Sequence, residues 1–213
     1  MKTEDLIKIL STNVPPAPRR QWGAALLIAS GIGMAVALCL QCSMYGTALE
    51  GLEGNHPGLQ AGVFALTLAL VAAGLRLLFV AGRPGKRLSA ALLPIGAVFL
   101  GLLLAGIVGF SRESRTSWGE LLSGEVLANC LTCVPVIAVP TLAALFWALR
   151  RGAPVYPALS GAAAGLVAGA MAVAALALHQ PVVSILATAV LYGSAIVSCA
   201  LVGALIGSRL LRW

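Results

Sequence analysis

Two stretches near the C-terminus decide the fold: PALSGAAAGLVAGAMAVAALAL, residues 157–178, and VSILATAVLYGSAIVSCALVGALIG, residues 183–207. Each is long enough to cross the hydrocarbon core of a bilayer as a helix, which takes about 20 residues. Glycines recur in them at every fourth position: Gly161, Gly165 and Gly169, then Gly203 and Gly207. Small residues at this spacing let helix backbones approach closely. We therefore expect these two helices to pair tightly through the short turn 179–182.

Four further apolar runs precede these two stretches, at residues 22–45, 59–80, 89–110 and 127–149. The chain is 60% hydrophobic and only 10% charged, whereas soluble domains carry about 25% charged residues. One globular core cannot hide this much apolar surface, so the bilayer must act as the solvent. We predict an all-α fold, a polytopic integral membrane bundle of six transmembrane helices. The bundle spans residues 21–213, and residues 1–20 form a tail outside the bilayer.

The basic residues favour one orientation of this bundle. They concentrate in the tail, in the connections after the second and fourth runs, and at the C-terminus. In the connections on the opposite side, the only Lys or Arg residues are Arg112 and Arg115. The positive-inside rule therefore places both termini in the cytoplasm. Because these residues flank apolar runs and form no basic stripe with interleaved aromatics, we expect no direct nucleic-acid contact despite the net charge of +7.

The apolar runs lack the polar groups that membrane chemistry requires. No Asp, Glu or Lys lies in the middle of any run. Pumps, proton relays and voltage sensors place ionisable side chains there, so this composition argues against all three. The chain has only two histidines, His56 and His179, and no serine nucleophile beside a base at a recognisable motif. We expect neither an enzyme nor a cofactor.

The tail opens with a short amphipathic segment, MKTEDLIKIL, residues 1–10. Thr3 can cap a helix here, and the apolar side chains gather on one face: Leu6, Ile7, Ile9 and Leu10. Two or three helical turns are marginal in water, so we expect this helix to form when that face is covered. A soluble protein with a groove could cover it, or the segment could lie on the membrane surface. The residues alone leave both alternatives open.

Four of the five cysteines form two pairs with the same spacing. Cys39 and Cys42 lie near the end of the first run, and Cys130 and Cys133 near the start of the fourth. Residues three apart share one face of a helix, so each pair could present two thiols to one spot. Pro135 loosens the backbone beside the second pair, because it has no N–H to donate.

Three roles are open for these thiols. They could bind a soft heavy metal, with His179 as an accessory ligand. They could be oxidised, since the outer side of a bacterial inner membrane is an oxidising compartment. They could also be small, weakly polar packing residues.

Several segments spread over nearly the whole chain carry a family resemblance. They are the opening residues 1–10, Pro16 with Arg19 and Arg20, the NCLTCVP segment 129–135, Pro140, the LRRGAP connection 149–154, residues 177–179 and the closing residues 207–213. In these segments the chain resembles the NrsF family of six-span bacterial membrane proteins. The most specific parts of this resemblance are the Asn-Cys-Leu-Thr-Cys segment and the Leu-Arg-Trp terminus.

This resemblance implies an anti-sigma factor of the bacterial inner membrane. The cytoplasmic tail would hold an extracytoplasmic-function sigma factor of the sigma-F kind, through Leu6, Ile7, Ile9 and Leu10. Periplasmic cysteines would release it under heavy-metal or oxidative stress, with Cys130 as a sensing thiol. From the residues of this chain we take Cys133 as the candidate second sensing thiol, with Cys39, Cys42 and His179 as possible accessories. The family pattern has a cysteine directly after the Ala-Leu-His segment, where this chain has Gln180. That departure leaves the choice of the second thiol open.

Two rival functions fit the same residues. A small transporter or metal-efflux protein could use the cysteine pairs as a relay for a soft metal. A structural membrane subunit could use the bundle only as a scaffold for another complex.

Overall fold

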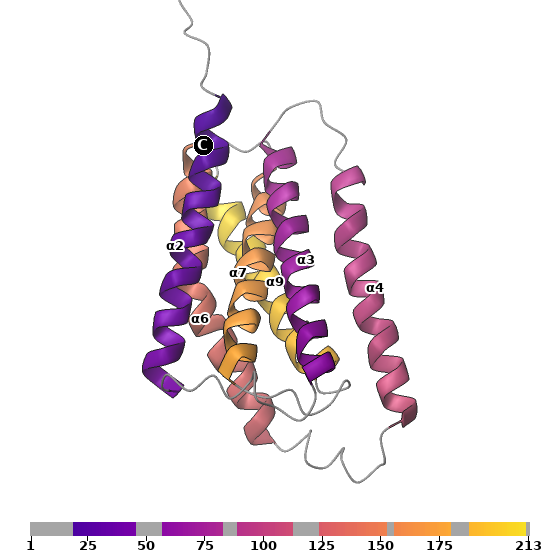
Figure 1. The fold of residues 1–213 in the computed structure, drawn as a ribbon. Coiled ribbons are helices and arrows are strands. Elements are labelled where there is room, and N and C mark those ends of the chain that lie inside the picture. Colours follow the sequence, from indigo (N-terminus) through magenta and orange to yellow (C-terminus); the bar gives the residue numbers. More distant parts are fainter. Residues whose placement is uncertain are drawn as a thin grey trace, which may run out of the picture.

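The computed structural model describes residues 19–45, 57–82, 89–112, 124–152, 156–179 and 188–211. Six long helices form the bundle: α2 (Arg19–Tyr45), α3 (Pro57–Ala81), α4 (Ser89–Arg112), α6 (Gly124–Arg150), α7 (Pro157–His179) and α9 (Gly193–Leu210) (Figure 1). A short π-helix, η2 (Thr188–Tyr192), leads directly into α9. All six helices are long and apolar enough to cross a membrane, and no strand occurs in the described ranges. The predicted all-α fold with six spanning helices is confirmed.

The helix boundaries follow the hydropathy of the chain closely. For the first five helices, the predicted and observed ends differ by a few residues. The last predicted run, 183–207, is described only from Thr188 onwards, where it opens as a π-helix. Helix α7 ends at His179, the first residue of the turn predicted at 179–182. The rest of that turn lies outside the described residues.

Helix α7 forms the centre of the bundle and packs against α2, α3, α6 and α9. In the apolar stretch of α7 that is long enough to span a membrane, 83% of the residues are buried inside the protein. In the corresponding stretch of α4 only 6% are buried. The sequence explains this position, because α7 consists largely of alanine and glycine and is therefore thin enough to be surrounded. Helix α4 packs mainly on α3 and η2 at the edge of the bundle.

The glycines of α7 and α9 bring the two backbones into contact, as their spacing predicts. A methyl carbon placed on Gly161 would lie 2.8 Å from Cα of Gly207, and one on Gly165 would lie 2.9 Å from Cα of Ala200. A methyl carbon on Gly203 would lie 2.9 Å from Cα of Gly165. Real Cβ atoms do not approach other atoms this closely, so only glycine fits at these three positions. The predicted tight pairing of these two helices is confirmed.

Both ends of the described chain lie at the same end of the bundle. Helix α2 begins there, and α9 ends there (Figure 1). We call this the proximal end and the opposite one the distal end. Helices α2, α4 and α6 meet the distal end near Tyr45, Arg112 and Gly124.

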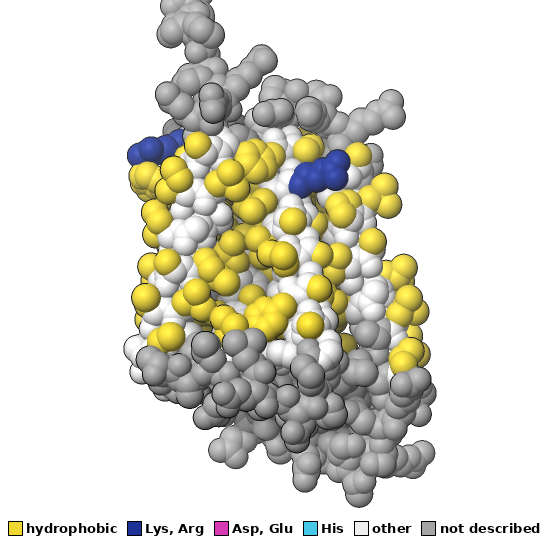
Figure 2. All heavy atoms as spheres, in the orientation of Figure 1, with side chains coloured by type: hydrophobic (Ala, Val, Ile, Leu, Met, Phe, Trp, Pro, Cys, Tyr) yellow, Lys and Arg dark blue, Asp and Glu magenta, His cyan; other side chains and the backbone are white. Residues whose placement is uncertain are grey.

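The flank of the bundle is apolar, and its charges lie at one end. Hydrophobic side chains cover the face in Figure 2, and the basic side chains visible on it lie toward the proximal end. Among the described side chains the only charged ones are those of Arg76, Arg150, Arg151 and Arg209. Arg76, Arg150 and Arg209 belong to helices that end proximally, and Arg151 directly follows one of them. Arg151 also stacks over the exposed ring of Trp147, 3.8 Å from the ring centroid. Such a pair is typical of a membrane boundary.

Candidate functional site at the distal end of the bundle

The fold gathers the predicted thiol positions at the distal end. Cys39 and Cys42 lie in the last turns of α2, Cys130 and Cys133 in the first turns of α6, and His179 is the last residue of α7. The side chains of Cys130 and His179 lie outside the described residues, as do the four tail residues predicted to bind a partner: Leu6, Ile7, Ile9 and Leu10.

The described thiols differ in burial. Cys39 is exposed on the flank of α2, Cys42 and Cys133 are half-buried, and Cys199 is buried in α9. Of the α2 pair, therefore, only Cys42 borders the interior of the bundle. No group of three or more His, Cys, Asp or Glu side chains that could hold a metal occurs in the described part of the chain.

Helices α2 and α6, which contain four of the cysteines, pack against each other along a seam. A methyl carbon on Gly33 of α2 would lie 2.7 Å from Cα of Thr141 of α6, so the two backbones nearly touch there. The helices run in opposite directions (Figure 1). The number of residues from Gly33 to Gln41 in α2 equals the number from Thr141 back to Cys133 in α6, and both steps lead toward the distal end. They are therefore level with each other along the seam.

Helix α6 runs without interruption through Pro135 and Pro140. Each proline removes the N–H that would bind the carbonyl four residues earlier, which is that of Leu131 for Pro135. Cys133 lies between Leu131 and Pro135 and packs against a core cluster that includes Val134 and Ala37. The thiol thus sits where α6 has lost one backbone hydrogen bond.

Two buried polar side chains on this seam were not predicted as site residues. Gln41 and Thr141 are both 0% exposed. Within the part of the chain that the structure describes, neither the nitrogen nor the oxygen of the Gln41 amide has a hydrogen-bond partner, and neither has the Thr141 hydroxyl. The sequence does contain a signal for Gln41, because this polar residue lies between Cys39 and Cys42 in an apolar run. Its burial could be known only once the faces of α2 were assigned.

A third polar contact ties α3 to α7 at the distal end. The amide nitrogen Nε2 of Gln60, near the start of α3, donates a hydrogen bond to the carbonyl oxygen of Ala177. That carbonyl would normally bind the N–H four residues later, but this residue is Pro181, which has none. Gln60 therefore satisfies a carbonyl at the end of α7 that its own helix cannot satisfy.

Replacing Gln60 with leucine is expected to lower the free energy of unfolding by about 1–3 kcal/mol, because it leaves the buried carbonyl of Ala177 without this donor. Thermal melting of the purified protein in detergent measures the change. Ala61→Leu is the matched control, since it adds the same side chain at the exposed neighbouring position. Equal melting temperatures for the two variants would show that the hydrogen bond contributes nothing.

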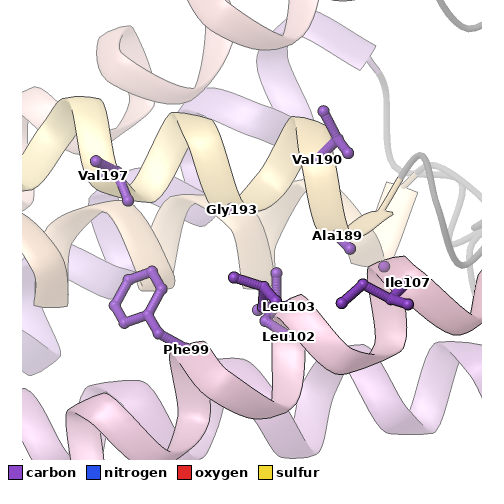
Figure 3. Close-up of a pocket in the computed structure, with 9 residues that line it drawn as sticks. Phe99, Leu102, Leu103, Ile107, Ala189, Val190, Gly193 and Val197 are labelled. Atoms are coloured by element: carbon purple, nitrogen blue, oxygen red, sulfur yellow. The ribbon is translucent and has the colours of Figure 1, made fainter.

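A groove between α4 and the η2–α9 segment opens on the flank of the bundle (Figure 3). It has a volume of about 470 Å³ and is lined only by apolar residues or glycine, among them Phe99, Leu103, Val190 and Val197. Without a polar or charged lining side chain it offers no chemistry and no recognition of a polar ligand. The polar groups of the distal end are therefore the better candidate site.

Comparison with known proteins identifies the family. Residues 10–213 match the family model NrsF, described as negative regulator of sigma F. The "Anti-sigma-F factor NrsF" of Caulobacter vibrioides is 30% identical over 225 residues, and the "Probable anti-sigma-F factor NrsF" of Azospira oryzae is 28% identical over 214 residues. Each match covers 100% of both chains. No solved structure matches. Since the family model covers nearly the entire chain, this protein belongs to the NrsF family of negative regulators of sigma F.

Proposed function

We propose that this chain is a membrane-anchored anti-sigma factor whose N-terminal tail holds an extracytoplasmic-function sigma factor of the sigma-F kind. The observation that carries the proposal is the match to negative regulators of sigma F over residues 10–213, together with two relatives of that name aligned over their full lengths. In this proposal both termini lie on the cytoplasmic side of the inner membrane, because the basic residues gather at the proximal end.

The tail is the part of the chain suited to a soluble partner. The described flank of the bundle is apolar and matches lipid, whereas residues 1–18 precede α2 on the side assigned to the cytoplasm. Leu6, Ile7, Ile9 and Leu10 form the face that a groove on the sigma factor would cover. Covering that face stabilises the helix, and the bound tail blocks the surface by which the sigma factor binds polymerase.

The distal thiols are suited to a signal from the opposite side of the membrane. Cys130 and Cys133 are the proposed sensing thiols, and Cys39, Cys42 and His179 lie at the same end. A heavy metal or an oxidant acting on α6 would change its packing along the seam with α2. Helix α2, about 40 Å long at 1.5 Å per residue, continues into the tail at its proximal end. A shift of α2 against α6 would therefore reach the bound sigma factor.

Recruitment to the membrane tests this function. A fluorescent fusion of the sigma-F factor should concentrate at the membrane when the full chain is co-expressed. It should stay in the cytoplasm when residues 2–18 are replaced by a Gly-Ser linker of the same length. The linker variant must reach the membrane in equal amounts for the comparison to hold. A sigma factor that follows the linker variant to the membrane contradicts the tail as the binding segment.

A further inference from the structure

The exposed side of α6 ends in a cluster of one aromatic and two basic side chains. Trp147, Arg150 and Arg151 are all exposed, and spacings of three and four residues place them on one side of the last helical turns. Arg151 continues the last turn, because its N–H donates to the carbonyl of Ala148. Its guanidinium lies over the Trp147 ring, 3.8 Å from the centroid. Two positive charges therefore lie close together on the surface, one of them held by an aromatic ring.

No carboxylate in the described part of the chain neutralises these two guanidinium groups. None of the described side chains belongs to Asp or Glu. Stacking on Trp147 engages one face of the Arg151 guanidinium, whereas its N–H donors lie in the plane of the group and are not used by the stacking. Phosphate oxygens are acceptors that match such a planar set of donors. The cluster therefore complements an anionic phosphate group in both charge and geometry.

The cluster also lies at the depth of the phosphates of a bilayer. The apolar stretch of α6 that can span a membrane runs from Thr132 to Arg150. Its 19 residues measure about 28 Å at 1.5 Å per residue, which matches the hydrocarbon core of a bilayer, about 30 Å thick. Arg150 is thus at the boundary of the hydrocarbon, next to the lipid headgroups.

An apolar stripe continues from the cluster along the same side of α6. It consists of Val136, Val139 and Ala143, which precede Trp147 at intervals of three or four residues, and all three are exposed. Val136 and Val139 are 57% and 59% exposed. The stripe lies within the hydrocarbon, so acyl chains are what can cover it. A molecule with an anionic head and apolar chains fits the cluster and the stripe together.

We propose that Trp147, Arg150 and Arg151 form a binding site for the headgroup of an anionic phospholipid. The two guanidinium groups bind the phosphate, and the acyl chains lie along the stripe. The occupant is a lipid and not a soluble phosphate, because the apolar stripe begins directly beside the charged cluster. The site stands without the proposed sigma-factor function.

Native mass spectrometry of the full chain, released from detergent micelles, measures the affinity for each lipid. Phosphatidylglycerol should bind the native chain more tightly than phosphatidylcholine, which has no net charge. Arg150→Gln with Arg151→Gln should weaken phosphatidylglycerol binding at least about tenfold, the loss expected for two basic residues at a membrane surface. Phosphatidylcholine binding should not change. Equal affinities of the native and the doubly substituted chain for phosphatidylglycerol would overturn the proposal.

A pair of single variants separates this site from a general attraction to the charged end of the bundle. Arg76 is also exposed, but it belongs to α3, whereas α6 packs mainly on α2, α7 and α9. Arg151→Gln should weaken phosphatidylglycerol binding about fivefold, whereas Arg76→Gln, which removes the same charge, should change it less than about twofold. Equal losses in the two variants would overturn a site on α6.

Trp147→Leu tests the site without changing the charge of the chain. It removes the ring that orients Arg151, so phosphatidylglycerol binding should weaken about threefold. Trp147→Phe keeps an aromatic face and should bind more tightly than Trp147→Leu. Native affinity in Trp147→Leu would contradict the cluster as a built site.

The soluble headgroup tests whether the occupant is a lipid. sn-Glycerol 3-phosphate, added at the same concentration as phosphatidylglycerol, should not displace it, because it has no acyl chains to cover the stripe. Displacement of half of the lipid or more would overturn the phospholipid as the occupant.

Discussion

Replacing Gly165 with leucine is expected to drive α7 away from α9 and to unfold the centre of the bundle. A methyl carbon at this position already meets the carbonyl oxygen of Cys199 and lies 2.9 Å from Cα of Ala200. Both are backbone atoms, which cannot rotate aside as a side chain can. Because α7 also contacts α2, α3 and α6, its displacement disturbs every long helix except α4.

The loss of stability in Gly165→Leu should be large. Overpacking of a close-packed core costs about 1–3 kcal/mol and sometimes more, and here the added group is a whole side chain set against backbone. We expect a cost of at least about 3 kcal/mol, which lowers the melting temperature by roughly 10 °C for a chain of this size. Thermal melting in detergent and the abundance of the variant in membranes measure the effect.

The matched control for this variant is Gly31→Leu in α2. Nothing lies within 4 Å of a methyl carbon placed on Gly31, and the residue is exposed on the flank. Leucine is also the better helix former, so the control should melt at the native temperature or slightly above it. If the two variants melt together, the glycine contact between α7 and α9 does not hold the bundle together.

Replacing Leu6 and Ile9 with aspartate in the same chain is expected to release the sigma factor. Burying a side chain of this kind contributes about 1.5–3 kcal/mol, so losing two should weaken binding at least about 100-fold. Each aspartate would in addition carry an unpaired charge into an apolar groove. Transcription from a sigma-F-dependent promoter should then rise to the level of a strain that lacks the regulator.

Ser11→Asp with Thr12→Asp is the control for the tail. It adds the same two charges directly after the apolar face instead of within it, and the promoter should stay silent. Both doubly substituted chains must be present in membranes at the native level. A promoter that stays silent with Leu6→Asp and Ile9→Asp at normal abundance would mean that another segment holds the sigma factor.

Hydropathy predicted the helices well because the bilayer constrains them strongly. A segment that spans the hydrocarbon must satisfy its backbone within one helix, so apolar run length alone located the ends of α2, α3, α4, α6 and α7 to within a few residues. The α7–α9 contact was predictable for a similar reason. Only small residues permit two backbones to touch, and their four-residue spacing marks one helix face.

The candidate site was predictable only in part. Residue type and spacing made Cys130 and Cys133 candidates, and their role stays a prediction. The level of Cys133 relative to Gln41 depends on the register between α2 and α6, which no local pattern contains. The hydrogen bond from Gln60 to Ala177 joins residues far apart in the chain and was missed for the same reason. The π-helical start at Thr188 was missed as well, because hydropathy does not distinguish a π-turn from an α-turn.

The predicted binding residues of the tail, Leu6, Ile7, Ile9 and Leu10, lie outside the described residues and stay a prediction. A helix this short takes its stability from what covers its apolar face. Its conformation is therefore a property of the complex more than of the chain, and a measurement with the partner is the one that bears on it.

The affinity of purified sigma-F factor for the full chain in lipid nanodiscs tests directly whether the tail holds the sigma factor. The native chain is compared with the Leu6→Asp, Ile9→Asp chain by biolayer interferometry. We expect a specific complex with the native chain and at least about 100-fold weaker binding to the substituted one. Equal affinities, or no complex with the native chain, would contradict this expectation.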